Sequence, residues 1–425
     1  MLKYFNLKDY PIEPQNFEEK LVWYGTIYTY FFYFTGTLYF VGPVVGWILV
    51  FRLLYRKYQG EDLPIPLTTW LWIFCSLLLL IALWGGLMDF NFDLASVIKA
   101  TLGWAKGWAL FAVLPLAGAL PIRPEILYRG ICVVGLQSIV FFPFYYIGSL
   151  LHLPSPLYKV PLNVFGAPPP CFEVGLYVID TDSPQPRINL FAPWASASGF
   201  IGNGLFPLPV QEKNLFWKAC GLGASLLMVY VCSGSRSAVV MVPLAYGLTW
   251  VLSNLTKPWF MIAAGFTSAL ATTIGLPIRD FAKDYVDKMK SARPGSTRVR
   301  ETLDRIALQR FPEALLFGHA APERGPKAVE HMPIGSHNTY TALLYLRGIV
   351  GFTAFVLGLT GSFFNLWWNS LKRPVAFCGL EVLFVIIFNS RYDSSEVTIY
   401  LIWQSLIVMG IAYCGEKAND AKIER

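Results

Sequence analysis

The sequence predicts an all-α integral membrane protein with about eleven transmembrane helices and a large loop on one side of the membrane. Three observations predict this fold class. Hydrophobic residues make up 55% of the chain and charged residues only 14%, whereas a soluble domain carries about a quarter charged residues. The hydrophobic residues form long runs, each near the roughly 20 residues that cross a bilayer. These runs do not alternate in polarity as the strands of a membrane barrel do.

The apolar runs that we expect to span the membrane follow one another along the whole chain. They lie near residues 25–53, 66–88, 101–121, 126–151, 196–210, 214–232, 237–253, 259–276, 339–367, 374–390 and 397–414. The first run is long and is interrupted by Gly36 and Pro43, so it has room for a further span, which would raise the count to about twelve. Eleven spans would put the N-terminus outside the cell, and twelve would put it in the cytoplasm.

Lysine and arginine in the short connections fall on one side of this topology, which the positive-inside rule assigns to the cytoplasm. The residues are Arg52, Arg56, Lys57, Arg123, Arg129, Lys213, Lys257, Lys372, Arg373, Lys417, Lys422 and Arg425. The opposite side then receives two long segments, 152–195 and 277–338. We expect a small hairpin that begins near Phe172 and ends at Arg187 in the first segment. The second segment should contain an amphipathic helix outside the membrane, from about Ser296 to Phe311.

The charge and the cysteines narrow the class further. A formal net charge of +7 would suggest nucleic acid only in a soluble protein. Here loop arginines and inward-facing lysines account for the charge, so we expect the lipid bilayer as a partner and no nucleic acid. Most of the seven cysteines lie inside apolar runs, where cysteine behaves as a small hydrophobic residue, and no disulfide framework is implied.

Ser233-Gly-Ser-Arg-Ser237 connects two predicted spans by almost no loop and places Arg236 at the outer membrane surface. An arginine at this depth has two interpretations of similar weight. It extends its side chain to the lipid headgroups, or it binds a diphosphate, because the planar guanidinium holds phosphate oxygens in bidentate fashion and keeps its charge.

The segment before and within the predicted outer helix is basic. It contains Lys288, Lys290, Arg293, Arg298, Arg300, Arg305 and Arg310, against only Glu301 and Asp304. For most of these residues a solvated basic face near anionic headgroups is the simpler interpretation. Arg300 differs because it opens the helical pattern that leads to Ala307 and Phe311, a position from which it could reach a phosphate.

Gly335-Ser-His-Asn-Thr-Tyr340 places His337 directly before the next predicted span. An interfacial histidine is more often a polar cap than a functional group. Two arginines at the same depth favour a functional role for His337, because imidazole can take a proton from a sugar hydroxyl near neutral pH. A metal site built from His319, His331 and His337 with Glu323 or Glu330 is disfavoured, since the spacing matches no closed ligand motif. We therefore expect no metal.

The charged residues within predicted spans are Lys106, Lys218 and Glu381. Intramembrane charges cost a few kcal/mol each and suggest a pathway or a headgroup contact. Both lysines can extend toward an interface, so Glu381 is the harder residue to explain structurally.

These features resemble the O-antigen ligase and polymerase family of bacterial envelope glycan assembly, over roughly residues 190–365. The matching motifs are Ser233-Gly-Ser-Arg236, Arg300 before Phe311, Leu315-Leu-Phe-Gly318, His337-Asn338 and Gly348-Ile-Val-Gly351. Their order and spacing agree with the family. One departure is Gly318-His319-Ala320, where the family often has Gly-x-Gly.

The resemblance implies a membrane glycosyltransferase of the GT-C-like class, with a lipid-accessible cavity under the periplasmic loop and no metal or cofactor. It implies three regions: 1–189 with the first spans and outer loop, 190–365 as the ligase-like core with its catalytic loop 277–338, and 366–425 with the last spans and a cytoplasmic tail. Carried over by motif, Arg236 and Arg300 bind the donor diphosphate and His337 is the base. Arg187, Ser233 and Asn338 are expected to contact the substrate as well.

The sequence therefore predicts an enzyme of the bacterial inner (plasma) membrane with its active site facing the periplasm. It would move a glycan from undecaprenyl diphosphate to an acceptor glycan or lipid-linked saccharide with inversion, as a surface polysaccharide polymerase or an O-antigen ligase. Polymerase is marginally preferred. A transporter of a small anion such as bicarbonate is the alternative, supported by Lys106, Lys218 and Glu381, although no inverted repeat is visible. A structural scaffold is a third interpretation, less favoured because Arg236, Arg300 and His337 coincide at one membrane face.

Overall fold

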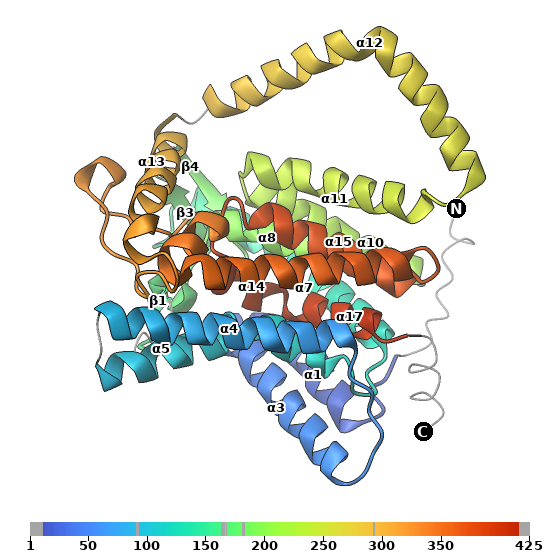
Figure 1. Ribbon diagram of the computed structural model, residues 1–425. Coiled ribbons are helices and arrows are strands. Elements are labelled where there is room, and N and C mark those ends of the chain that lie inside the picture. The colour runs from blue at the N-terminus through green and yellow to red at the C-terminus, as the bar shows by residue number, and fades with distance from the viewer. Residues whose placement is uncertain are drawn as a thin grey trace.

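The computed structural model of the protein describes residues 12–90, 93–162, 166, 168–180, 183–291 and 294–415. Most of the helices run side by side in one bundle (Figure 1). The longer helices are α3 (Leu38–Tyr58), α4 (Leu67–Phe90), α7 (Pro124–Leu150), α11 (Arg236–Asn254), α12 (Pro258–Ser291), α13 (Pro294–Arg310), α14 (Thr339–Ser370) and α15 (Pro374–Asn389). Shorter helices are α1 (Phe17–Ile27), α2 (Thr29–Phe34), α5 (Leu94–Lys106), α6 (Leu110–Ala117), α8 (Ala195–Leu205), α9 (Pro207–Val210), α10 (Leu215–Leu227), α16 (Ser395–Thr398) and α17 (Trp403–Tyr413).

Short helical turns and four strands complete the fold. The turns are η3 (Pro169–Phe172), the π-helical η4 (Met228–Cys232), η5 (Phe311–Ala314), η6 (Lys327–Val329) and η7 (Ile399–Ile402). Strand β1 (Tyr158–Lys159) pairs with β2 (Glu173–Val174), and β3 (Tyr177–Asp180) pairs with β4 (Ser183–Ile188), both antiparallel. The predicted hairpin that ends at Arg187 is thus confirmed, although its strands begin at Tyr177 and not at Phe172.

Seven helical runs in the described part of the chain are long and apolar enough to cross a membrane, and the bent pair α5–α6 would make eight. The molecule is therefore a helical membrane protein, but the predicted number of about eleven spans is not confirmed. Three of the predicted runs form helices that are too short to count as spans. The run 196–210 is divided into α8 and α9 at Pro207, while 259–276 and 374–390 correspond to the shorter apolar helices Pro258–Leu270 and Pro374–Asn389.

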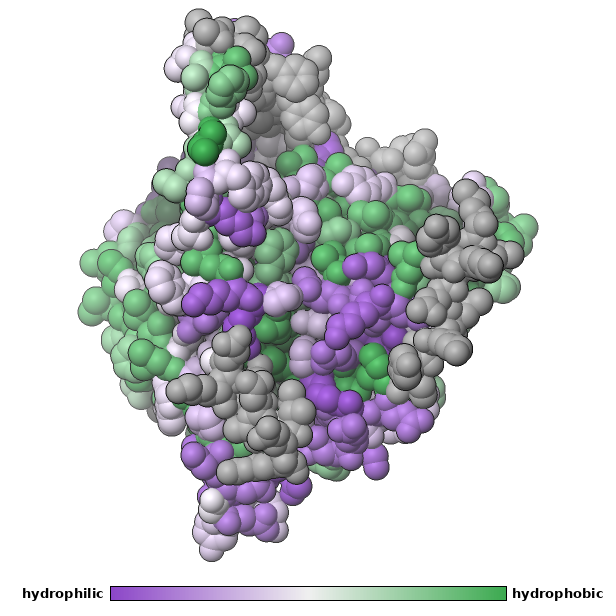
Figure 2. Space-filling view, turned by 90° about the vertical axis from the view of Figure 1, so that its right-hand side faces the viewer, coloured by the Kyte–Doolittle hydropathy of each residue, from purple (hydrophilic) through white to green (hydrophobic). Residues whose placement is uncertain are grey.

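The side surface of the bundle is apolar in the way that lipid contact requires. On α4, Trp70, Phe74 and Ile81 are about half exposed, whereas Trp72 and Leu79 on the opposite face are buried. One helix face thus packs inward and the other points away from the protein. Figure 2 looks onto the end of the molecule at the right of Figure 1, where hydrophilic residues gather across the middle and hydrophobic residues lie along the margins.

The core is formed mainly by α4, α6, α14, α15 and α17, and small residues allow these helices to approach closely. Gly118, which ends α6, lies directly against Gly410 of α17, so that a side chain at either position would meet backbone atoms. Close contact through small residues is how membrane helices gain packing energy where lipid offers no hydrophobic drive. The core draws residues from all three sequence regions, and the division at 365/366 falls within α14.

The segment 277–338, which was predicted to form a long loop, is mostly helical at its start. Helix α13 confirms the predicted amphipathic helix, with Val299, Leu303 and Ala307 buried against Tyr345 of α14. Helix α12, in contrast, continues through residue 291, where a loop was expected from residue 277. Figure 1 shows α12 as a bent helix that stands away from the bundle above α11. Of the predicted basic cluster, Arg293 and the side chains of Lys288 and Lys290 lie outside what the structure describes.

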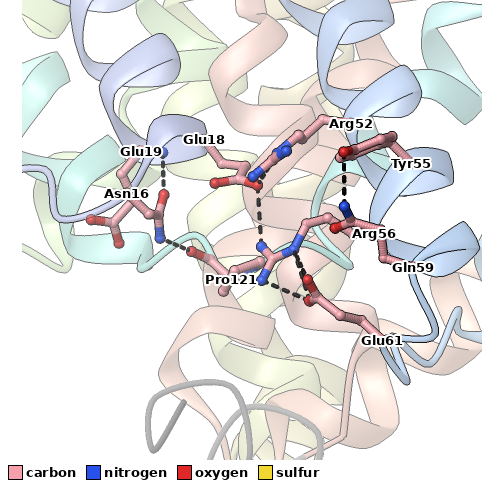
Figure 3. A network of polar contacts seen from close by, with 9 residues as sticks. All are labelled: Asn16, Glu18, Glu19, Arg52, Tyr55, Arg56, Gln59, Glu61 and Pro121. Carbon is pink, nitrogen blue, oxygen red and sulfur yellow. Dashed lines mark hydrogen bonds and ion pairs between the residues drawn. The ribbon is translucent and has the colours of Figure 1, made fainter.

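The end of the bundle opposite to α13 and the strands is held by ion pairs (Figure 3). Glu18 accepts from Arg52 at 3.0 Å and from Arg56 at 3.1 Å, and Glu19 accepts from Arg123 at 2.7 Å. Both carboxylates are only 1% exposed. Because these pairs connect α1 with α3 and with the start of α7, they fix the first helix on the bundle. We call this set the α1 ion network.

Candidate functional site

The six predicted site residues form two groups at the end of the bundle that carries α13 and the strands. The first group contains Arg187, Ser233 and Arg236, and the second contains Arg300, His337 and Asn338. We call this end the loop end.

The first group is built on the turn between η4 and α11. The Ser233 hydroxyl donates to the carbonyl of Val229 at 2.6 Å and accepts the backbone N–H of Ser235 at 3.1 Å. Ser235 is the N-cap of α11, and Arg236 is its first residue. Ser233 itself is fully buried. Its hydroxyl therefore shapes the turn from inside, and the predicted contact of Ser233 with a substrate has no exposed atoms to support it.

Arg187 reaches the same turn from strand β4. A Cβ atom placed on Gly234 would lie 3.0 Å from the Arg187 Nε and 3.3 Å from its Cζ. Gly234 also has a φ of +53°, a conformation that favours glycine. Glycine thus serves both the turn geometry and the approach of the guanidinium. The sequence analysis expected Arg187 to contact the substrate but did not predict that it lies beside Gly234.

The second group is held by an aspartate that the sequence analysis did not select. The Asp304 carboxylate accepts from the Asn338 amide at 3.1 and 3.2 Å, from the Thr341 hydroxyl at 2.7 Å and from Arg391 at 3.1 Å. The amide oxygen of Asn338 in turn caps α14 by accepting the N–H of Tyr340. Asn338 is buried and uses both ends of its amide, so it positions the segment rather than presenting groups to a substrate.

Asp304 could have been found from one signal in the sequence. It lies four residues after Arg300 on the predicted helix, and residues at this spacing share a helix face. The face that carries both side chains meets the 337–341 segment. Arg391 had no comparable signal, because its position beside Asp304 depends on the packing of the turn after α15.

His337 lies next to Arg300 and Asp304. Burial and the positive charge of Arg300, opposed by the Asp304 carboxylate, together lower the pKa of His337 to about 4. The imidazole is therefore neutral at physiological pH and has a lone pair for a proton. Its Nε2 lies 3.2 Å from the Met332 Sδ, a weak hydrogen-bond acceptor that leaves the ring able to change partners.

Arg300 differs from the other arginines of α13 in being partly buried without a partner among the described residues. It is partly buried, yet its guanidinium makes no ion pair or hydrogen bond within the part of the chain that the structure describes. Arg310 on the same helix is instead bound by Glu313 and Glu323, and Arg391 by Asp304. Arg298 and Arg305 are exposed. The expectation that one arginine of the basic helix differs from its neighbours thus agrees with the geometry.

Asp393, in the turn between α15 and α16, connects the two groups. Burial raises the pKa of Asp393 to about 6, while the Ser394 N–H, the charge of Arg300 and the Trp194 side chain act in the opposite direction. Trp194 is the residue before α8, and Gly199 of α8 packs against Ser233. Asp393 thus interacts with Trp194, at the start of α8, and with the charge of Arg300.

The two glycine motifs of the resemblance are brought together at a break in α14. Gly348 has a φ of +61° and interrupts the helix. The 315–320 segment fills the break: Leu315 and Leu316 accept from Ile349 at 2.9 Å and Val350 at 3.3 Å. On the other side of the break, the N–H groups of 319 and 320 donate to the carbonyls of 345 and 346. Both motifs therefore serve one backbone junction.

Ala320 stands where the family that the chain resembles often has a glycine. Its φ is +59°, so the chain adopts here, with an alanine, the left-handed conformation that glycine would adopt more easily. The Gly318-His319-Ala320 turn is formed nevertheless. His319 is buried, with its Nε2 3.2 Å from Glu313 and its ring stacked on Tyr345.

Neither a metal site nor a similarity to a known protein assigns a function to the loop end. Among the described residues, no three His, Cys, Asp or Glu side chains lie close enough to hold a metal ion. All seven cysteines are free and buried. The chain matches no protein-family model, and no similar curated protein is found. The fold and the loop end thus define a helical membrane protein with a cationic, histidine-containing site.

Proposed function

We propose that the protein is a membrane glycosyltransferase of the bacterial inner membrane, with its loop end facing the periplasm. It moves a glycan from a polyprenyl diphosphate to an acceptor glycan, as a surface polysaccharide polymerase or an O-antigen ligase. The observation that carries the proposal is a partly buried Arg300 without an ion pair in the described part of the chain, next to a neutral His337. This combination offers an anion site and a proton acceptor side by side.

The reaction that fits this pair is a direct displacement. His337 takes the proton from the acceptor hydroxyl as its oxygen attacks the anomeric carbon, and the bond between that carbon and the diphosphate oxygen breaks. The configuration at the anomeric carbon is inverted. The departing diphosphate gains negative charge, which Arg300, Arg236 and Arg187 stabilise without a metal.

Donor binding would also tune the base. In the free protein the charge of Arg300 lowers the pKa of His337. A bound diphosphate compensates that charge, so the pKa of His337 rises toward the neutral range, where a general base is most effective. The histidine thus becomes a better base only when the donor is present.

A polymerase and a ligase share this chemistry and differ in the acceptor. The supporting residues concern the donor and the proton, so they favour neither strongly, and we retain the slight preference for a polymerase. Anion transport is the second candidate, because Glu381 in α15 is 1% exposed and its Oε2 has no hydrogen-bond partner among the described residues.

The test is glycan display in cells that carry His337→Ala, Arg300→Ala or Arg236→Ala, with Arg305→Ala as the matched control. Arg305 is an exposed arginine on the same helix as Arg300. We expect the three site variants to lose long glycan chains at normal membrane levels, and Arg305→Ala to keep them. Accumulation of single lipid-linked units would identify a polymerase. Unchanged glycan in all three variants would refute the proposal and direct attention to ion flux through Glu381.

A further inference from the structure

The 315–320 segment presents two neighbouring leucines to the outside of the protein. Leu315 is 51% exposed and Leu316 is 56% exposed. The sequence analysis assigned this stretch to a loop outside the membrane, yet no Lys, Arg, Asp or Glu occurs between Glu313 and Glu323. A loop in water rarely combines exposed leucines with the absence of charge. The surroundings of the two leucines show what covers them.

Two exposed helix faces on α14 and α4 lead to these leucines. The two helices lie side by side in the bundle (Figure 1). Exposed residues recur on each at every third or fourth position, which places them on one helix face. On α14 they are Ile349, Thr353, Leu357, Thr360, Phe364 and Trp368, and on α4 they are Leu67, Trp70, Phe74, Leu77, Ile81, Trp84 and Met88. We call these two faces the lipid-facing stripes, because they form part of the apolar side surface of the bundle.

The 315–320 segment touches both stripes at the loop end. The carbonyls of Leu315 and Leu316 accept the N–H groups of Ile349 and Val350, so the leucines adjoin the first residue of the α14 stripe. A Cβ atom placed on Gly85, next to Trp84 in α4, would lie 2.6 Å from the Phe317 ring. The exposed leucines therefore continue the apolar side surface and are not isolated on the loop.

The depth of the segment follows from the lengths of the two helices. Lys372 and Arg373 follow the end of α14, so Ser370 lies near the lipid headgroups. At about 1.5 Å per residue, α14 rises about 33 Å from Ser370 to Gly348, and α4 rises about 27 Å from Leu67 to Gly85. The hydrocarbon core of a bilayer is about 30 Å thick. Both helices thus place the 315–320 segment at the boundary of the hydrocarbon on the loop-end side.

The backbone of the segment meets the requirement of that depth. Irregular backbone at membrane depth is tolerated only where the protein itself bonds its polar groups. The N–H groups of 318, 319 and 320 donate to the carbonyls of 314, 345 and 346, and the carbonyls of 315 and 316 accept from α14. His319 is buried. The segment therefore exposes apolar side chains and keeps these polar groups inside the protein.

We infer that residues 315–320 form a short re-entrant segment whose Leu315 and Leu316 contact the acyl chains of the membrane leaflet at the loop end. The partner of this surface is lipid, and the inference does not depend on the proposed transfer reaction. Only η5 separates the segment from α13. The two leucines thus anchor the outer helix, with Arg300, to the bilayer.

Spin-label accessibility tests this inference on the full chain in nanodiscs of phosphatidylethanolamine and phosphatidylglycerol. Leu315→Cys and Leu316→Cys carry a nitroxide label one at a time. Leu357→Cys on the α14 stripe is the control for hydrocarbon, and Arg305→Cys at an exposed position of α13 is the control for water. The wild-type chain, whose seven cysteines are all buried, gives the background labelling.

We expect the labels at 315 and 316 to collide more with dissolved oxygen than with a water-soluble nickel chelate, as the label at 357 does. The label at 305 should show the opposite preference. The inference requires the oxygen preference at both leucines. A preference for nickel at either one would overturn it, because that residue would then lie in water. Low collision rates with both reagents would also overturn it, because protein and not lipid would then cover the leucines.

Discussion

The two ends of the bundle use arginine in opposite ways. In the α1 ion network, Arg56 and Arg123 meet carboxylates that are almost completely buried. At the loop end, Arg300 is partly buried without any ion pair to a described residue, and its charge acts on His337. The charge of a paired arginine is neutralised by its carboxylate and stabilises the fold. An arginine held without a counter-ion can still bind an anionic ligand. The same residue type therefore means stability at one end and chemistry at the other.

Among the predicted variants, replacement of Arg300 should have the largest effect. We expect Arg300→Ala to lower transfer from a polyprenyl diphosphate donor by about 100-fold or more, the size of losing one preorganised charge on a leaving group. Thermal stability should change little, because no bond to a described residue is lost. Transfer rates and melting temperatures of purified Arg300→Ala and Arg305→Ala protein measure both quantities. A large loss of stability in Arg300→Ala would mean that this arginine is structural after all.

Replacement of Asp304 should reduce transfer less than replacement of Arg300, by disturbing the position of His337. Asp304→Asn weakens the bonds to Asn338, Thr341 and Arg391, so His337 is held less firmly, and we expect roughly a tenfold lower kcat with little change in KM for the donor. Glu301→Gln, an exposed acidic residue on the same helix, should have no effect. Equal losses in both variants would show that the net charge of α13 matters and not the position of His337.

At the opposite end, Glu18→Gln should reduce stability and spare chemistry. Glu18 is buried but its arginines are partly exposed, so we expect a loss of roughly 1–3 kcal/mol, below the figure for a fully buried pair. Glu61→Gln, at a half-exposed carboxylate beside the same Arg56, should cost less. Thermal unfolding in detergent gives the ranking, and a loss of transfer at full stability in Glu18→Gln would contradict it.

The most sensitive test follows the pKa of His337 itself. Burial and, to a smaller extent, the charge of Arg300 lower this pKa to about 4, so Arg300→Ala should raise it. Activity that needs the neutral ring would then begin to fall at a higher pH as the solution is acidified. Ring NMR signals resolve this titration, since the chain has only four histidines. An identical His337 titration in wild type and variant would show that the two groups do not interact.

How far the sequence predicts the fold depends on how local each feature is. Helix α13 was predicted because Leu303 and Ala307 repeat at helical spacing. The predicted count of about eleven spans is not confirmed, and the run 196–210 forms two short helices, α8 and α9, within the described residues. In the site, the spacing from Arg300 to Asp304 indicates a shared helix face, but the residues that Asp304 binds could not be predicted. Its partners Asn338, Thr341 and Arg391 come from distant parts of the chain, and only tertiary packing brings them to one carboxylate.

The break at Gly348 has a consequence for how the protein is made. A helix that enters the bilayer with open carbonyls at 345 and 346 and open N–H groups at 349 and 350 would pay several kcal/mol for each unsatisfied group. The 315–320 segment that satisfies them precedes α14 in the chain, so it leaves the ribosome first. Insertion of α14 and docking of the loop are therefore one event in biogenesis, and a deletion within 315–320 should send the chain to membrane proteolysis before the site is ever assembled.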